Sequence, residues 1–296
     1  MAQLHQIRRR LKSIGKIEQI TSAMERVAAS KMRRAQAAAA CSRPYAASAR
    51  EILAQLVLLT DPQAHPLFAR REVTQRLIIM FSSDRGLAGA YNSNLARLLL
   101  RELPGKAGRA STPRLIVIGR KGALLAAKLE QHGDAQVIGA YTDWPAEPSS
   151  TTLQPIVDTA IGEFTTQRVD AVDILFTDFV SSLRQQATLR RLLPIDPSTV
   201  WPAAAERSRA LTEALFEPSP AAVLTYIVPR LLGVQLYQAS LEAAASEHSM
   251  RMLAMKNASD NADGILDDLR LTYNSARQAA ITQELAEISG GVEAMK

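Results

Sequence analysis

The C-terminal part of the sequence has the pattern of one very long helix, and this restricts the possible folds more than any other feature. From about Ser219 to about Ser289 the apolar residues recur at helical spacing. Roughly seventy residues at about 1.5 Å each give about 105 Å, which no compact domain of this size contains. Pro229, Gly233 and Gly264 form no turn-like cluster, so we expect one helix, bent at most. The apolar stripe includes Ile227, Leu231, Val234, Leu241, Met252, Met255, Leu266, Leu269, Tyr273, Ile281, Leu285 and Ile288.

The N-terminus carries a second long helical pattern, which extends to about Thr60. Its first apolar positions are Leu4, Ile7, Leu11, Ile14, Ile17, Ile20, Met24 and Val27. Their spacings of 3, 4, 3, 3, 3, 4 and 3 predict a coiled coil with a local irregularity around Gly15. Pro44 is expected to produce a kink or a local distortion. The segment 61–68, with two prolines, ends the helix.

One segment of this helix, Thr21 to Ala40, is rich in Ala, the best helix former, and poor in large apolar residues. At 100° per residue its side chains separate into two faces. The small face consists of Met24, Ala28, Ala35 and Ala39, and the cationic face of Arg26, Arg33 and Arg34. The small face predicts close approach to another helix, and the cationic face predicts an acidic partner.

Between the two helical patterns, short apolar runs alternate with helical segments. The expected strands are 76–83, 114–119, 172–180 and 185–195, the last antiparallel, and the expected helices are 92–103 and 120–133. Residues 141–152 are expected to form a loop. Alternation of this kind indicates a Rossmann-like layer with a mainly parallel sheet. The predicted fold class is α/β: a long antiparallel coiled coil of the terminal helices with an inserted Rossmann-like domain, divided into 1–60, 61–218 and 219–296.

Composition limits the classes of function. Hydrophobic residues make up 47% of the chain, which suffices for a core, and the net charge of +6 favours an acidic partner. Cys41 is the single cysteine, so neither a disulfide framework nor a Cys/His zinc motif can be formed. We expect no signal peptide and no membrane span, because no apolar run is long enough. Aromatic residues are 5% of the chain and none lies among the N-terminal arginines, which argues against nucleic acid.

Candidate catalytic motifs are weak. Residues 82–92, "SSDRGLAGAYN", follow an expected strand and open a helix, yet they contain neither GK[ST] nor GxGxxG. The histidines His5, His65, His132 and His248 have no partner at ligand spacing, and Asp267 and Asp268 point about 100° apart on a helix. No nucleophile, base and oxyanion donor come together. We therefore expect no catalytic residues, no cofactor-binding residues and no metal ligands.

Four stretches resemble the γ subunit of F-type ATP synthase. The terminal ones are "QITSAMERVAASKMRRAQ" (19–36) with "SRPYA" (42–46), and "YNSARQAAITQELAEISGG" (273–291). The other two are "SSDRGLAGAYNSNL" (82–95) and "SEHSMRMLAMKNASDNA" (246–262). The resemblance covers nearly the whole chain and is looser from about 105 to 214.

This resemblance implies a non-catalytic rotor shaft. In that family the antiparallel terminal helices stand inside a hexamer of α and β subunits, and the globular part contacts the ε subunit and the membrane c-ring. Ion flow turns the ring and the shaft, and the shaft drives each β site through the states that bind, form and release ATP. No transit peptide precedes the first helix, which indicates a bacterial enzyme on the cytoplasmic face of the plasma membrane.

Residues of the shaft that match positions of β-subunit contact and coupling in the family are carried over by position. They are Met24, Arg26, Lys31, Arg33, Arg34, Glu247, Arg251, Arg277, Gln278, Thr282 and Glu284. The basic residues among them would complement an acidic lever of the β subunit. Exposed ion pairs are worth only about 0–1 kcal/mol each, so steering and register are the expected roles.

The chain departs from the family pattern at Ser22, often Lys, and at Arg26, often apolar. Two other interpretations stay open at this point. The chain could be a nucleotide-binding α/β protein with coiled-coil arms, on the strength of residues 82–89, or a coiled-coil tether for an acidic protein scaffold.

Overall fold

The computed structural model describes residues 2–59, 65–103, 112–145, 148–196, 217 and 219–294. The chain forms two compact units, one of Met1–Ala29 with Arg251–Lys296 and the other of Ser30–Met250. Helix α1 covers Ala2–Leu59 and helix α6 covers Pro220–Ala294, so the two long terminal helices on either side of an α/β segment are confirmed. The three-segment division at 60 and 218 stays a prediction.

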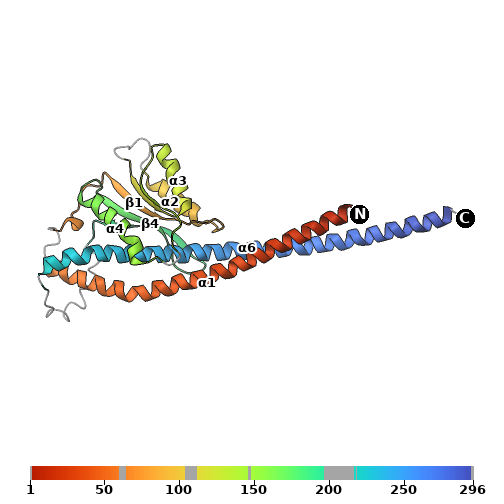
Figure 1. Ribbon diagram of the computed structural model, residues 1–296, viewed down its shortest axis with the longest axis horizontal. Helices are drawn as coiled ribbons and strands as arrows, with labels where there is room; N and C mark the ends of the chain where they lie inside the picture. Colours follow the sequence, from red (N-terminus) through yellow and green to blue (C-terminus); the bar gives the residue numbers. More distant parts are fainter. Residues whose placement is uncertain are drawn as a thin grey trace. The chain divides into compact units, whose positions relative to one another are not determined.

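In the first unit the N-terminal part of α1 and the C-terminal part of α6 run antiparallel (Figure 1). On the α1 side Ile7, Thr21 and Ala28 are buried, and on the α6 side Met255, Ser259, Ala262 and Leu266 are buried. The Ser259 hydroxyl donates to the Glu18 carboxylate at 3.5 Å. This seam has few large side chains, so the two helices approach closely along it.

The expected irregularity of the seam around Gly15 is wrong. Ile17, Ile20 and Val27 are 46%, 59% and 57% exposed, whereas Thr21 and Ala28 are buried. The buried positions Ile7, Thr21 and Ala28 are separated by multiples of seven, so the seam keeps a regular heptad spacing. Ala28 is only 2% exposed, and a branched side chain there would hold the helices apart. The close packing of the two helices therefore buries the small residues Thr21 and Ala28 and leaves the larger apolar side chains next to them exposed.

The second unit contains a five-stranded sheet of order β3-β2-β1-β4-β5, in which β5 is antiparallel to β4 and the other pairs are parallel. Its strands are β1 Arg76–Phe81, β2 Arg114–Ile118, β3 Gln136–Tyr141, β4 Ala171–Phe179 and β5 Gln185–Leu193. Its shorter helices are η2 Pro66–Phe68, α2 Tyr91–Glu102, α3 Arg120–Gln131 and α4 Ser150–Thr165. The mainly parallel Rossmann-like layer is confirmed.

The sheet lies between two apolar layers (Figure 1). In β1, Leu77, Ile79 and Phe81 pack on the side of α4 and α6, while Ile78 and Met80 pack on the side of α2 and α3. Strand residues alternate between faces, and both faces are covered, so the run "RLIIMF" is apolar throughout. The two halves of the core are thus set by the pleat of the strands.

Two of the longer elements were not predicted from the sequence. Strand β3, "QVIGAY", is an edge strand with no buried residue, and Gly139 interrupts its short apolar run. Helix α4 begins within the expected loop 141–152, where Ser149 caps it in a capping box with Thr152. Serine and threonine at that spacing are a helix-start signal, which the prolines around it concealed.

Candidate functional site

The predicted contact residues of the first unit lie on both of its helices. On α1, Met24 is half-buried and Arg26 is exposed. On α6, Arg251 is 9% exposed, and Arg277, Gln278, Thr282 and Glu284 are exposed. The Thr282 hydroxyl donates to the Gln278 carbonyl at 2.9 Å, which is a bond within the helix. The exposed side chains of this group are therefore available to another chain, whereas Arg251 belongs to the packed seam.

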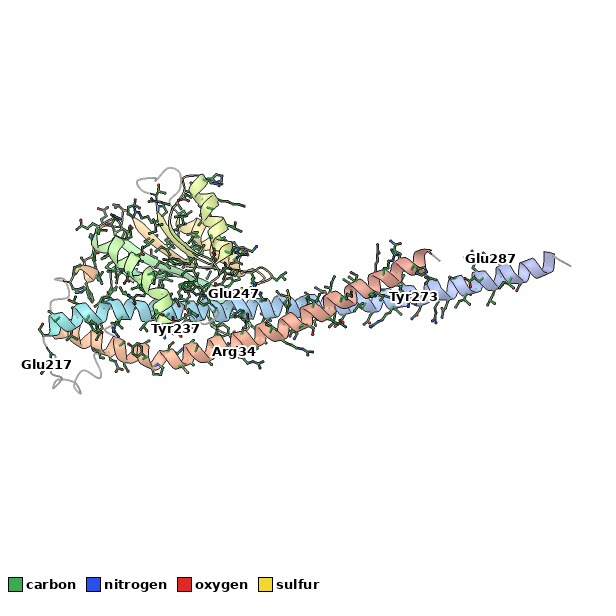
Figure 2. The ribbon with its side chains drawn as sticks, in the orientation of Figure 1. Arg34, Glu217, Tyr237, Glu247, Tyr273 and Glu287 are labelled. Atoms are coloured by element: carbon green, nitrogen blue, oxygen red, sulfur yellow. The ribbon has the colours of Figure 1, made fainter. Side chains whose placement is uncertain are left out.

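The last part of α6 carries an apolar stripe without cover from this chain. Ile281, Leu285 and Ile288, which belong to the apolar stripe expected from the sequence, are 48%, 60% and 65% exposed. They recur at i, i+4 and i+7, so they share one side of the helix. Helix α6 extends past the N-terminal end of α1 here, and Figure 2 shows Glu287 on this part. An aligned apolar stripe of this kind is typical of a surface that another protein covers.

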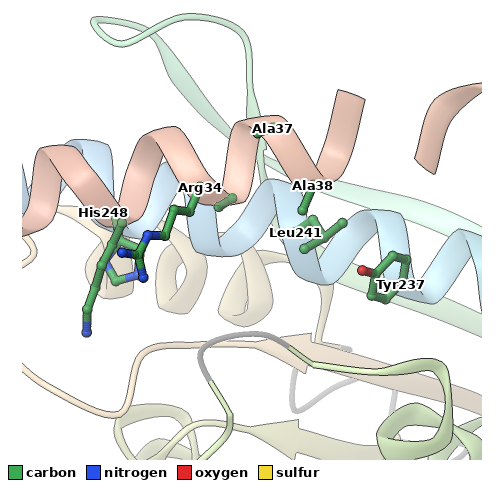
Figure 3. A pocket seen from close by; sticks show the side chains of 8 residues that line it. Arg34, Ala37, Ala38, Tyr237, Leu241 and His248 are labelled. Carbon is green, nitrogen blue, oxygen red and sulfur yellow. The ribbon is translucent and has the colours of Figure 1, made fainter. Parts of the chain in front are cut away.

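Two of the predicted contact residues of the second unit, Lys31 and Arg34, line a cavity of about 370 Å³ between α1 and α6. Arg34 of α1 and His248 of α6 lie at one end of it, with Tyr237 at the other (Figure 3), and Lys31 of α1 is also part of its lining. Ala37 and Ala38 leave the space that larger residues would fill. Arg33 is exposed on α1 and Glu247 is half-buried on α6. The structure thus brings Lys31 and Arg34 together with His248, which the sequence analysis left unassigned.

This cavity has a basic rim and an apolar floor. Leu241, Tyr237 and the alanines supply the apolar surface, while the two cationic side chains and the imidazole supply the polar one. An acidic side chain entering here would meet opposite charge in a partly desolvated setting, where such a contact is stronger than on an open surface. The site can therefore bind an acidic group, and it holds no arrangement of nucleophile and base.

The loop after β1, "SSDRGLAG", lies where a Rossmann-like sheet would bind a nucleotide, and a carboxylate of the chain itself fills the position. Asp84 accepts hydrogen bonds from the backbone N–H groups of Arg120 at 2.9 Å, Asp143 at 3.1 Å and Trp144 at 2.9 Å. The Ser82 hydroxyl accepts from the N–H of Gly122 at 2.8 Å. Donors at the start of α3 are therefore satisfied internally.

A phosphate binds at a helix N-terminus through free N–H groups and the positive end of the helix dipole. At the start of α3 the carboxylate of Asp84 already accepts a backbone N–H group and lies at the positive end of the helix dipole. Its negative charge would repel a second anion. The loops after β1, β2 and β3 are tied together by the same side chain. This geometry argues against the nucleotide-binding interpretation and assigns the loop a structural role.

Glu242 of α6 has a strongly perturbed acidity. Burial raises the pKa of its carboxyl from 4.5 to about 7; Arg190 opposes the rise, and the like charge and hydrogen bond of Asp178 add to it. Arg43 of α1 also opposes the rise. The nearest Arg190 nitrogen is 3.9 Å from Oε2, which has no hydrogen-bond partner. Near neutral pH this carboxyl changes charge at the contact between α6 and the sheet.

Stability is expected to fall as the pH rises through about 7 because of Glu242. The folded chain holds this proton with a pKa of about 7 and the unfolded chain with about 4.5, so the stabilisation is complete below pH 4.5 and is lost as the pH rises. Because the side chain is partly exposed, we expect a loss of about 1–2 kcal/mol between pH 5 and 8. Urea unfolding of Glu242→Gln at both pH values should lack this loss.

Glu287→Gln, on an exposed part of α6, provides the matched control and should keep the wild-type pH dependence. Equal pH slopes for the wild type and Glu242→Gln would contradict the assignment.

Within the described residues no helix has the length and apolar character needed to cross a membrane. The same part of the chain contains no group of three or more His, Cys, Asp or Glu side chains placed to hold a metal ion.

Comparison with known proteins gives a consistent match over the whole chain. A family model described as ATP synthase matches residues 3–295. The ATP synthase gamma chain of Moorella thermoacetica is 37% identical over 296 residues, covering 100% of both chains. That of Herpetosiphon aurantiacus is 40% identical over 303 residues, covering 100% of this chain and 99% of the relative.

Solved structures agree in fold. A chain in the Euglena gracilis mitochondrial ATP synthase (OSCP/F1/c-ring, rotational state 3) matches with a TM-score of 0.67 and 18% identity, covering 99% of this chain and 95% of that one. A chain in the rotor of the same enzyme in rotational state 1 matches with a TM-score of 0.62 and 17% identity, covering 95% and 99%.

Proposed function

The chain belongs to the ATP synthase family, with gamma chains as its relatives, and on this premise we propose that it is the rotating central stalk of an F-type ATP synthase. The observation that carries the proposal is the match over residues 3–295, which includes both long helices. Its partners are the hexamer of α and β subunits, the ε subunit and the membrane c-ring. The shaft couples rotation of the ring to ATP synthesis or hydrolysis at the β subunits.

The physical basis of coupling is a shift in the populations of β-subunit conformations. A shaft can change the state of a β subunit only if it contacts different conformations with different free energy. The exposed apolar stripe of Ile281, Leu285 and Ile288 would lie against the hexamer. The cationic side chains Arg26, Arg33 and Arg34 would meet acidic segments of successive β subunits.

Catalysis in this proposal belongs to the β subunits and not to this chain. The contact residues carried over from the family, of which Met24 is the first and Glu284 the last, act by guiding the β subunits to the shaft and by fixing the angle at which they meet it. The chain works at the cytoplasmic face of a bacterial plasma membrane, held there by the c-ring. This location is supported by the bacterial origin of the relatives named above.

Reconstitution tests the function directly. The purified chain alone should hydrolyse no ATP, and mixing it with α, β and ε subunits and the membrane sector should restore ATP hydrolysis coupled to ion pumping. Substantial ATPase activity of the isolated chain would refute the proposal. So would normal coupling in an enzyme assembled without it.

Charge reversal separates a rotor from a static tether. The triple variant Arg26→Glu, Arg33→Glu and Arg34→Glu should still assemble and should lower the ratio of ions pumped to ATP hydrolysed, because apolar contacts hold the shaft while the charges set its register. We expect a loss of about 2- to 10-fold in that ratio, equivalent to about 0.4–1.4 kcal/mol. A tether would instead lose binding to the hexamer.

A control with the same change in net charge uses three exposed residues of α2 and α3: Arg97→Glu, Lys121→Glu and Lys128→Glu. This control should leave pumping per ATP unchanged. If both triple variants lowered it equally, net charge rather than the shaft surface would be responsible.

A further inference from the structure

A stripe of polar residues on α6 faces the hairpin formed by β4 and β5. Its members are Glu242, Ser246 and Ser249, which recur at i, i+4 and i+7 and therefore share one side of the helix. Ser246 and Ser249 are both 0% exposed. Buried serines on a helix that is otherwise covered by apolar packing require a specific reason, because burying an unpaired hydroxyl is unfavourable.

Each serine hydroxyl bonds to the hairpin instead of to its own helix. The Ser246 hydroxyl donates to the Thr177 carbonyl of β4 at 3.0 Å. The Ser249 hydroxyl donates to the Ser182 carbonyl in the turn at 2.8 Å and accepts from the Gln185 amide of β5 at 3.0 Å. Serine in a helix commonly bonds to its own preceding turn, as Ser240 does to Tyr237 at 2.8 Å.

The turn is itself held rigid around this contact. The side-chain amide of Gln185 also donates to the carbonyls of Ser181 at 2.9 Å and Ser182 at 2.8 Å. One turn further back on α6, Glu242 approaches Arg190 of β5, and the guanidinium of Arg190 stacks 4.7 Å from the ring centre of Phe176. The helix is thus hydrogen-bonded to β4, to the turn and to β5 through two of its residues, Ser246 and Ser249.

These contacts restrict one motion in particular. Close apolar packing opposes a large turn of the helix about its axis, because such a turn would expose buried side chains. A turn of a few degrees changes these non-directional contacts little. Hydrogen bonds weaken steeply with misalignment, and three of them on one side of a helix oppose such a turn. The adjoining face of α6 is packed by apolar residues such as Leu236, Ala239 and Ala243, whose contacts depend less on small changes of angle.

We propose that the contact of Ser246 and Ser249 with Thr177, Ser182 and Gln185 is a torsional anchor, through which the α/β part of the chain drives rotation of α6. The inference rests on the proposed function, because an anchor against twisting matters only in a shaft that carries torque. Ser246 and Ser249 are positioning residues: they touch neither nucleotide nor β subunit and act by holding the helix.

The test uses the assembled enzyme and the double variant Ser246→Ala and Ser249→Ala, which removes two hydroxyls and adds no volume. The measurement is the torsional stiffness of the shaft, taken from the angular fluctuation of a probe on the c-ring while the hexamer is stalled. We expect the stiffness to fall about 2-fold, and each single variant to give a part of that fall. ATP hydrolysis without load should stay within about 2-fold of wild type.

Ser240→Ala is the matched control, since Ser240 is also buried on α6 but bonds within the helix. Ser240→Ala should leave the torsional stiffness unchanged. If any loss of a buried serine hydroxyl softened the shaft by lowering stability, Ser240→Ala would lower the stiffness too. Stiffness of the double and single variants equal to that of Ser240→Ala and wild type would overturn the anchor. If the wild-type chain itself neither assembles nor rotates with its partners, the proposed function fails instead. Should the double variant fail to assemble, the single variants decide the question by the same measurement.

Discussion

Asp173→Asn is expected to destabilise the folded chain by about 2–4 kcal/mol, because it removes the charge that two arginines share. The carboxylate of Asp173 is 2% exposed and accepts from Arg76 Nη2 at 2.6 Å and Nε at 2.9 Å, and from Arg191 Nε at 2.5 Å. A neutral amide would leave two guanidinium groups repelling each other at the same point. Their partial exposure keeps the expected loss below that of a fully buried pair. Urea unfolding of the full chain measures it.

Asp143→Asn is the matched control, with the same chemical change in an ion pair on the surface. Asp143 pairs with Arg120 at 2.7 Å, and its side chain is 75% exposed. Solvent screens such pairs, so we expect a change of about 0–1 kcal/mol. Asn also tolerates the positive φ of 58° at this residue. Equal losses for the two variants would show that burial does not govern the Asp173 cluster.

Gly119→Ala is expected to be still more damaging, with a loss of about 4 kcal/mol or more or a failure to accumulate folded protein. Gly119 joins β2 to α3 with φ 98° and ψ 141°, a conformation that L-residues with side chains rarely adopt. A Cβ there would lie 2.3 Å from the Ser82 carbonyl oxygen and 2.7 Å from its carbon. Backbone cannot move aside as a flexible side chain can. The urea midpoint and the soluble yield measure the loss.

Gly133→Ala separates the two causes of that loss. Gly133 also has a positive φ, 72°, yet nothing lies within 4 Å of its added Cβ. We expect about 1–2 kcal/mol from the backbone conformation alone. The difference between the two variants then measures the clash with Ser82 together with the rarer backbone conformation at Gly119. A loss at Gly119 no larger than at Gly133 would mean that the β1 loop shifts without resistance.

The role of the β1 loop depends on residues that are distant in the sequence. The sequence of the loop contains no phosphate-binding signature, which agrees with the observed geometry, but the missing signature did not indicate what the loop does. The structure adds that Asp84 bonds to three backbone N–H groups in the loops after β2 and β3, 36 to 60 residues away in the sequence. No local pattern indicates such a partner, because the pairing exists only when the strands lie side by side.

The helical seams show a similar limit. Periodicity correctly predicted that α1 and α6 are long helices, and it correctly placed Ala28, Ala35 and Ala39 on a buried face. It also counted Ile17 and Ile20 among the coiled-coil positions of α1, and both are exposed. Hydrophobicity alone ranks isoleucine above alanine for burial, whereas a closely packed seam selects by size.

The sequence by itself determined the elements whose signals are local: the two long helices, the central apolar strands with their parallel order, and the family. Helix periodicity and strand propensity act over a few residues, so they can be recognised without knowing what packs against them. Only the tertiary structure decided which stripe of α1 is buried, that Asp84 occupies the start of α3, and that Ser246 and Ser249 bond to the β4–β5 hairpin. Each of these depends on a surface contributed by a distant part of the chain, and burial and hydrogen bonding are properties of both surfaces together.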